Sequence, residues 1–382
     1  MVEPDRGEVR ERVTGERHPD ERRGERRHGR DADGEDSVPG CHEVRVWHAL
    51  PKASRVQRGA REGARIGPVH EPDDEFSDLA ALAAASGVTE PLRASRQVVR
   101  TDDGRETAAI RWDTADGREA RITYLHGLGI DAHSFDQTAI AVGEPAVALD
   151  LPGHGRSSWR DDADYGASTT APQVLAALDA LGVPPGVVVG HSLGAILAGR
   201  LAATAPERVT GLVLVDMSPD FAQRAVDRIA RALEDETPFA SLEEVVDRAV
   251  EARVGDDRAV LLREARHTTR LGADGRLVRR HHFPHLPAGR TASVGRFADA
   301  WPDLEALDVP LLLVRGDRGY VSPKLHAGFT ERLPDAEVVT VTARHAVQNQ
   351  APLELASAIR AWGARHRLLH EVQQPSSGTD RR

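Results

Sequence analysis

The most constraining feature of this chain is the turn Gly-His-Ser-Leu-Gly at residues 190–194. The all-valine run 187–189 before it is typical of a buried strand, and apolar residues at helical spacing follow it up to residue 205. A strand that turns directly into a helix at such a motif holds its serine in a strained conformation, and the two glycines allow close approach of the backbones. The pattern therefore predicts that Ser192 stands at a strand end, with the N–H of Leu193 at a helix N-terminus.

Further short apolar runs recur along the chain and alternate with segments whose apolar residues have helical spacing. Runs of about four residues without polar alternation are typical of strands buried on both faces of a parallel sheet. A predicted hairpin, residues 98–100 and 107–112, precedes them, and the runs are residues 122–125, 146–149, 212–215, 311–314 and 338–341. This order predicts an α/β fold with a mainly parallel sheet flanked by helices.

The composition divides the chain into segments of different kinds. Residues 1–75 begin with a densely charged stretch that contains few apolar residues, so we expect a mostly disordered extension. Residues 76–219 and 306–366 carry the strand and helix pattern and form the predicted core. Residues 220–305 lack a strong strand signal and are too long for a structureless loop, which predicts a helical cap between strands six and seven. Residues 367–382 are expected to be a loose tail.

Charge and cysteine content exclude several classes of protein. Of the 382 residues, 50 are Lys or Arg and 60 are Asp or Glu, which gives a net charge of −10 and argues against nucleic acid as a partner. No apolar run is long enough to span a bilayer, and the charged N-terminus lacks a secretory pattern. The single cysteine, Cys41, excludes internal disulfides. We expect a cytoplasmic protein with a small-molecule substrate, no membrane partner and no cofactor; its oligomeric state stays open.

Three histidines in the predicted cap, at positions 281, 282 and 285, could suggest a metal site. No matching pattern of carboxylates accompanies them, so we predict no metal and expect these side chains to face solvent or substrate.

Two other turns follow predicted strands: His-Gly-Leu-Gly at residues 126–129 and Asp-Leu-Pro-Gly-His-Gly-Arg-Ser at residues 150–157. Together with the serine turn, and in this order, they resemble the α/β-hydrolase superfamily over roughly residues 95–365. The resemblance implies an oxyanion hole formed by the backbone N–H groups of Leu128 and Leu193. It also implies that Asp150 and His154 hold loops together.

A serine hydroxyl is a weak nucleophile at neutral pH and needs a positioned base. His345 is the candidate base, because it comes directly after the last predicted strand and the superfamily places its histidine there, last in the order serine, acid, histidine. Arg344 stands where the superfamily usually has glycine.

The sequence leaves two residues as candidates for the acid. Asp216 follows the run 212–215, and Asp317 follows the run 311–314 after Gly316. Some esterases of the superfamily carry the acid after strand six, and they resemble this chain in having Tyr-Val-Ser after strand seven, here residues 320–322. That resemblance favours Asp216, with Asp317 as the alternative.

These residues predict a serine hydrolase that cleaves an ester, thioester or lactone of a small, fairly apolar molecule through an acyl-enzyme. Two alternatives stay open: a carbon–carbon bond hydrolase with the same triad, and a non-catalytic binding protein with a hydrolase fold. Substrate identity depends on cap side chains whose directions the sequence does not show.

Overall fold

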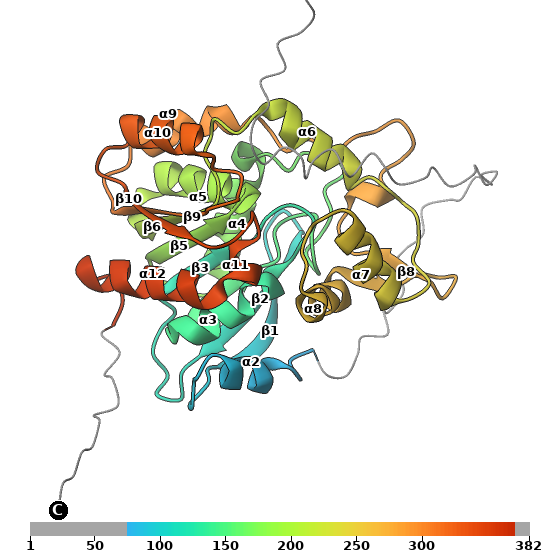
Figure 1. Cartoon of the computed structure of the whole chain (residues 1–382), viewed down its shortest axis with the longest axis horizontal. Coiled ribbons are helices and arrows are strands. Elements are labelled where there is room, and N and C mark those ends of the chain that lie inside the picture. The colour runs from blue at the N-terminus through green and yellow to red at the C-terminus, as the bar shows by residue number, and fades with distance from the viewer. Residues whose placement is uncertain (1–74, 371–382) are drawn as a thin grey trace, which may run out of the picture. The chain divides into compact units, whose positions relative to one another are not determined.

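The computed structural model describes residues 75–370, which fold around an eight-stranded sheet (Figure 1). β2 pairs antiparallel with both neighbours and the other pairs are parallel, which confirms the predicted fold class. In spatial order the strands are β1 (Arg93–Arg100), β2 (Glu106–Asp113), β4 (Ala146–Leu149), β3 (Ile122–Leu125), β5 (Gly186–His191), β6 (Val209–Val215), β9 (Leu311–Gly316) and β10 (Glu337–Val341). Most of the extension expected over residues 1–75 lies outside the described residues.

Helices cover both faces of the sheet because successive strand residues point to opposite sides. Leu212 and Leu214 pack into one hydrophobic cluster, and Val213 and Val215 into another. The first face is covered by α4 (Ala167–Ala180), α5 (Leu193–Thr204), α9 (Trp301–Glu305) and α10 (Pro323–Arg332). The second is covered by α3 (Asp136–Val142), α11 (Val347–Gln350) and α12 (Pro352–Arg365), with α2 (Leu79–Ala85) beside α3 (Figure 1).

The insertion between β6 and β9 has a small hydrophobic core of its own. It contains α6 (Gln223–Ala232), α7 (Leu242–Glu251) and α8 (Arg258–Thr268), and the buried side chains of Phe239, Val245 and Leu261 pack together there. Ser241 and Asp257 cap the N-termini of α7 and α8. We call this insertion between β6 and β9 the cap.

The cap differs from the purely helical one that we expected. An antiparallel hairpin of β7 (Thr269–Leu271) and β8 (Leu277–Arg279) follows α8 directly. Each strand has three residues and includes an arginine, so neither shows the apolar run or the regular alternation that reveals longer strands. Between the strands, Gly272 donates its N–H to the carbonyl of Arg276.

The chain returns to the core before the end of the predicted cap. Trp301 and Leu304 of α9 are buried in the main cluster, and Leu304 lies so close to Gly199 of α5 that a Cβ there would be 2.9 Å from its Cδ2. The start of the expected loose tail is also packed, because Leu369 is buried against α12. Short 3₁₀ turns complete the described fold: η1 (Ala132–Phe135), η2 (Pro206–Arg208), η3 (Phe283–His285) and η4 (Phe297–Ala300). Within residues 75–370, no helix has the length and apolar character that crossing a bilayer requires.

Candidate active site

Ser192 occupies a strained turn between β5 and α5. Its backbone has φ 54° and ψ −117°, a conformation rare for a residue with a side chain. A Cβ at Gly190 would lie 2.2 Å from the carbonyl oxygen of Gly194, and a Cβ at Gly194 would lie 2.1 Å from that of Leu125. Both glycines are therefore required by close backbone contacts, as the motif predicts.

Asp216 and His345 meet at the carboxyl edge of the sheet. Nδ1 of His345 donates to Oδ2 of Asp216 at 2.9 Å, and the Asp216 side chain is fully buried. The carboxylate also accepts from the backbone N–H groups of Gly316, at 3.0 Å, and Tyr320, at 2.7 Å. Like Ser192, Asp216 has a positive φ, 46°, so local strain concentrates on the two residues. The carboxylate is held by three donors and orients the imidazole.

Asp317, the alternative acid, points elsewhere. Its Oδ1 accepts the backbone N–H of Ala343 at 3.0 Å, and 43% of its side chain is exposed near Arg318. Within residues 75–370 it has no hydrogen bond to His345. Asp317 therefore supports the loop that leads to His345 through the backbone of Ala343.

Tyr320 contacts both members of the Asp216–His345 pair. Besides its N–H bond to Asp216, its ring stacks on the imidazole of His345 with centroids 3.7 Å apart and planes 13° apart. Phe221 stacks on Tyr320, 4.6 Å away. A Cβ at Gly319 would lie 2.2 Å from Oδ1 of Asp216, so only glycine lets the chain pass there. The sequence showed Tyr320 only as part of a short motif, and no local pattern signals its stacking.

His191 fixes the backbone of His345. Its Nε2 donates to the carbonyl oxygen of His345 at 3.0 Å, and its Nδ1 lies 3.3 Å from Nε2 of Gln348. Burial, and then the nearby charge of His345, lower the pKa of His191, which favours the neutral ring that this pattern needs. A Cβ at Gly127 would lie 2.6 Å from Nδ1 of His191, so the 126–129 turn packs directly on this ring.

The 126–129 turn lies against Ser192. A Cβ at Gly127 would also lie 3.1 Å from Cβ of Ser192, which places the neighbouring Leu128 beside the serine. Nδ1 of His126 donates to the carbonyl of Gly127 at 2.7 Å, and Nε2 accepts the N–H of Leu151 at 2.9 Å.

Leu193, the other residue expected in the oxyanion hole, is the first residue of α5. The first N–H groups of a helix lack partners within it and point toward its N-terminal end.

The 150–157 turn braces the 126–129 turn. Asp150 accepts the N–H groups of Ala132 at 2.9 Å and Arg156 at 3.0 Å, and Nδ1 of the buried His154 lies 3.1 Å from the carbonyl oxygen of Pro152. These contacts match the structural role expected for Asp150 and His154.

Comparison with known proteins agrees with this arrangement. A family model described as the alpha/beta hydrolase fold matches residues 121–352, more than half of the chain. The chain belongs to the α/β-hydrolase family. Esterase Rv0045c of Mycobacterium tuberculosis is 36% identical to this hydrolase over 296 residues, covering 75% of the chain and 95% of that protein. Lipase LipV of the same organism is 31% identical over 258 residues, covering 63% and 92%.

A solved structure of the M. tuberculosis esterase Rv0045c matches with a TM-score of 0.64 at 33% identity, covering 75% of the hydrolase and 98% of that chain. The hydrolase is an enzyme of the carboxylic ester hydrolase kind.

A cavity of about 120 Å³ begins at the 126–129 turn of the hydrolase and extends into the cap. Its apolar walls include Leu128, Leu233, Phe239 and Leu261, and its polar groups include Glu264. Asn349 donates to Glu264 at 2.7 Å. Burial, and then the charge of Asp131, raise the pKa of Glu264 to about 7.

The cap histidines of the hydrolase, which we expected to face solvent or substrate, differ in exposure: His281 is buried, whereas His282 and His285 are half-buried. His281 is only 2% exposed, beside His154 and Phe283. The rings of His282 and His285 both stack on Trp159. Local sequence could not show this, because Trp159 lies in the core more than 120 residues earlier. Among residues 75–370 no group of three or more His, Cys, Asp or Glu side chains is arranged to hold a metal ion.

Proposed function

We propose that this protein is a cytoplasmic serine hydrolase that cleaves the ester bond of a small molecule through an acyl-enzyme. The observation that carries the proposal is the 2.9 Å hydrogen bond from His345 to the buried Asp216, with Ser192 on a strained turn nearby. In this proposal Ser192 is the nucleophile, His345 is the base and Asp216 is the acid.

The first half of the reaction would form the acyl-enzyme. Oγ of Ser192 attacks the carbonyl carbon while Nε2 of His345 takes the hydroxyl proton. The N–H groups of Leu128 and Leu193 donate to the oxyanion, each worth about 3 kcal/mol by analogy with other oxyanion holes. The tetrahedral intermediate collapses, and the leaving alcohol receives the proton from His345.

The second half would release the acid. Water attacks the acyl-enzyme as His345 takes one of its protons, and the collapse of the second tetrahedral intermediate returns this proton to Oγ of Ser192. Asp216 keeps Nδ1 of His345 protonated in both halves, so Nε2 is always the atom that exchanges protons.

The cavity at the 126–129 turn supports a small, fairly apolar substrate. It starts at Leu128, whose N–H is one of the proposed oxyanion donors, and its volume of about 120 Å³ is lined by apolar side chains together with the charged Asp235, Arg248, Glu264 and Arg279. A pocket of this size and lining favours a short acyl or alcohol group. An ester, a thioester and a lactone all present the same carbonyl to Ser192.

A series of nitrophenyl esters from acetyl to dodecanoyl tests the proposal, with matched acyl-thioesters and a ring-cleavage diketone as further arms. We expect kcat/KM to peak at short acyl chains and to vanish in Ser192→Ala. A fluorophosphonate should add once, at Ser192, and mass spectrometry of the labelled peptide would locate it. A protein that neither turns over any arm nor reacts with the fluorophosphonate would instead be a binding protein, and turnover of the diketone alone would indicate a carbon–carbon bond hydrolase.

A further inference from the structure

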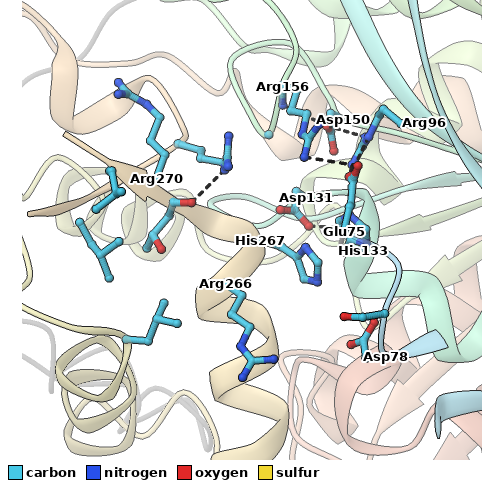
Figure 2. A pocket seen from close by; sticks show the side chains of 17 residues that line it. Glu75, Asp78, Arg96, Asp131, His133, Asp150, Arg156, Arg266, His267 and Arg270 are labelled. Atoms are coloured by element: carbon cyan, nitrogen blue, oxygen red, sulfur yellow. Dashed lines mark hydrogen bonds and ion pairs between the residues drawn. The ribbon is translucent and has the colours of Figure 1, made fainter. Parts of the chain in front are cut away.

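A second and larger cavity lies between the cap and the N-terminal part of the core (Figure 2). Its volume is about 560 Å³. None of the residues proposed for catalysis or the oxyanion hole lines it. Core residues that line it come from the segment 75–78, β1, the segment 131–133 and the 150–157 turn, and cap residues come from α7, α8, β7, β8 and the residue that follows β8. The proposed ester hydrolysis gives this cavity no role.

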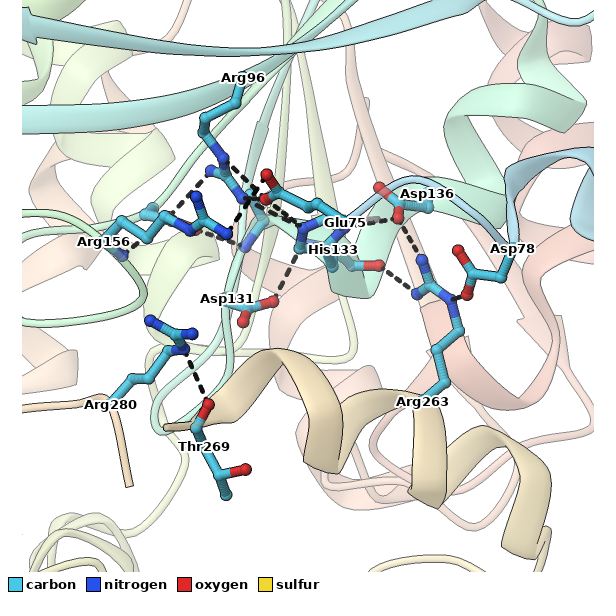
Figure 3. Close-up of polar contacts among 12 residues, drawn as sticks. Glu75, Asp78, Arg96, Asp131, His133, Asp136, Arg156, Arg263, Thr269 and Arg280 are labelled. Atoms are coloured by element: carbon cyan, nitrogen blue, oxygen red, sulfur yellow. Dashed lines mark hydrogen bonds and ion pairs between the residues drawn. The ribbon is translucent and has the colours of Figure 1, made fainter. Parts of the chain in front are cut away.

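The core wall of the cavity carries carboxylates as well as cations: Glu75, Asp78, Asp131 and Asp150 line it beside Arg96, Arg156 and His133. Glu75 accepts from Nε of Arg96 and lies near Nε2 of His133, both at 2.9 Å, and pairs with Arg156 at 3.3 Å (Figure 3). Arg96 also pairs with Asp150 at 3.0 Å. Although burial opposes it, Asp136 and Glu75 raise the pKa of His133 to about 9, so His133 is a third cation of this wall.

The cap wall is different, because its charged residues are all cationic. Arg266, Arg270 and Arg280 line the cavity, and no carboxylate of the cap does. Arg280 donates to the carbonyl of Thr269 at 2.9 Å and faces Asp131 across the cavity (Figure 3).

Arg270 is half-buried and has no hydrogen bond or ion pair within residues 75–370. Burial, and then the charge of Arg280, lower its pKa, so its charged neighbour is another cation.

An apolar surface adjoins this arginine. Leu271, the next residue of β7, is 55% exposed and is one of three large hydrophobic residues with such exposure in the described chain. Leu242 and Leu277 line the same cavity. Arg270 and Leu271 thus both line the cavity, the first without a carboxylate partner among residues 75–370 and the second with its side chain uncovered there, and one amphipathic anion would stabilise both.

We propose that this cavity binds a soluble small molecule with a phosphate or carboxylate group on an apolar chain. Arg270 and Arg280 donate to the anionic group, and Leu242, Leu271 and Leu277 contact the chain. A guanidinium presents a planar pair of N–H donors that matches a phosphate or carboxylate, and the partly buried site strengthens the contact. This site does not depend on the proposed ester hydrolysis.

Calorimetry on the full chain with octyl phosphate and octanoate as probes tests the proposal. We expect both to bind, octanol to bind more weakly than either, and octyltrimethylammonium not to bind. Affinity should fall as salt rises. Arg270→Gln should weaken the binding of octyl phosphate by about 10- to 100-fold. Arg270→Lys should weaken it less, because lysine keeps the charge but lacks the planar pair of donors. Leu271→Ser should weaken the binding of octyl phosphate about fivefold and leave the binding of ethyl phosphate unchanged.

Arg296→Gln is the matched control, because Arg296 is exposed and lies outside the cavity. It should bind both probes like the parent, and so should Ser192→Ala, which separates this site from catalysis. Equal affinity in the parent, Arg270→Gln and Arg270→Lys would overturn the proposal. Binding of octanol as tight as that of octyl phosphate would also overturn it, as would a failure of octyl phosphate and octanoate to bind in the millimolar range. Binding only to vesicles of phosphatidic acid would overturn it too and would indicate a membrane contact instead.

Discussion

Nδ1 of His345 donates to Oδ2 of Asp216 across 2.9 Å, although 129 residues separate them along the chain. The two residues follow different strands, β10 and β6, whose carboxyl ends lie at the same edge of the sheet. Only one imidazole nitrogen faces the carboxylate, so the other can face the serine.

Asp216→Asn should lower kcat by about 10³–10⁴-fold, by analogy with the equivalent substitution in another serine hydrolase triad. The neutral asparagine amide would neither stabilise the imidazolium of His345 nor hold the proton of the neutral ring on Nδ1. Asp317→Asn is the matched comparison and should cost about tenfold or less, since Asp317 bonds the backbone of Ala343. Steady-state kinetics on a short nitrophenyl ester measure both. Greater damage from Asp317→Asn would assign the acid to the loop after β9.

Tyr320→Ala should lower kcat by about 10- to 100-fold with little change in KM, because the imidazole of His345 loses the ring that stacks on it at 3.7 Å. Tyr320→Phe keeps the stacked ring and the backbone bond to Asp216, so it should retain most activity. Stopped-flow acylation rates separate this effect from substrate binding. Equal losses in both variants would show that the hydroxyl matters and the stacking does not.

Gly319→Ala should reduce activity at least as much as Tyr320→Ala does. A Cβ at this position would collide with the carboxylate of Asp216, which must then move away from His345. Gly104→Ala is a control for glycine substitution itself, because a Cβ there meets no atom within 4 Å. Gly104 has a φ of 80°, so alanine would strain the backbone there, but this strain is confined to an exposed turn. Ester turnover and the melting temperature, both measured for each variant, would separate a loss of catalysis from a loss of stability. Full activity in a folded Gly319→Ala protein would contradict the proposed role of Asp216.

Glu264→Gln should stabilise the protein at pH 8 but not at pH 4.5. Burial and the charge of Asp131 raise the folded-state pKa of Glu264 to about 7, above its ordinary value, so the folded state binds a proton more tightly than the unfolded state. Stability from this group is therefore greatest below about pH 4.5 and decreases as the pH rises to about 7. Glutamine removes that decrease, a gain of about 1–3 kcal/mol at pH 8.

Urea unfolding at the two pH values measures the effect of Glu264→Gln. Glu251→Gln, at an exposed position of α7, is the control and should leave the difference between the two pH values unchanged. A Glu264→Gln protein that is no more stable than the parent at pH 8 would show that Glu264 is ionised in the folded state without penalty.

Local pattern was sufficient for the features that depend on neighbouring residues in the chain. Short apolar runs predicted the core strands because a strand buried on both faces needs apolar side chains at successive positions. The glycines at 190 and 194 predicted the strained turn of Ser192, since only residues without a Cβ fit those backbone contacts. The three-residue strands β7 and β8 were missed because they are too short, and too rich in arginine, to show either pattern.

Contacts between distant segments were decided by the tertiary structure. Asp216 and Asp317 both follow strands that end at one edge of the sheet, and the sequence left both as candidates for the acid. The path of the chain through residues 342–345 turns His345 toward Asp216, while the carboxylate of Asp317 bonds Ala343. The stacking of His282 and His285 on Trp159 is likewise a contact between distant segments. Such choices depend on distances across the fold, which the order of residues along one strand or helix does not specify.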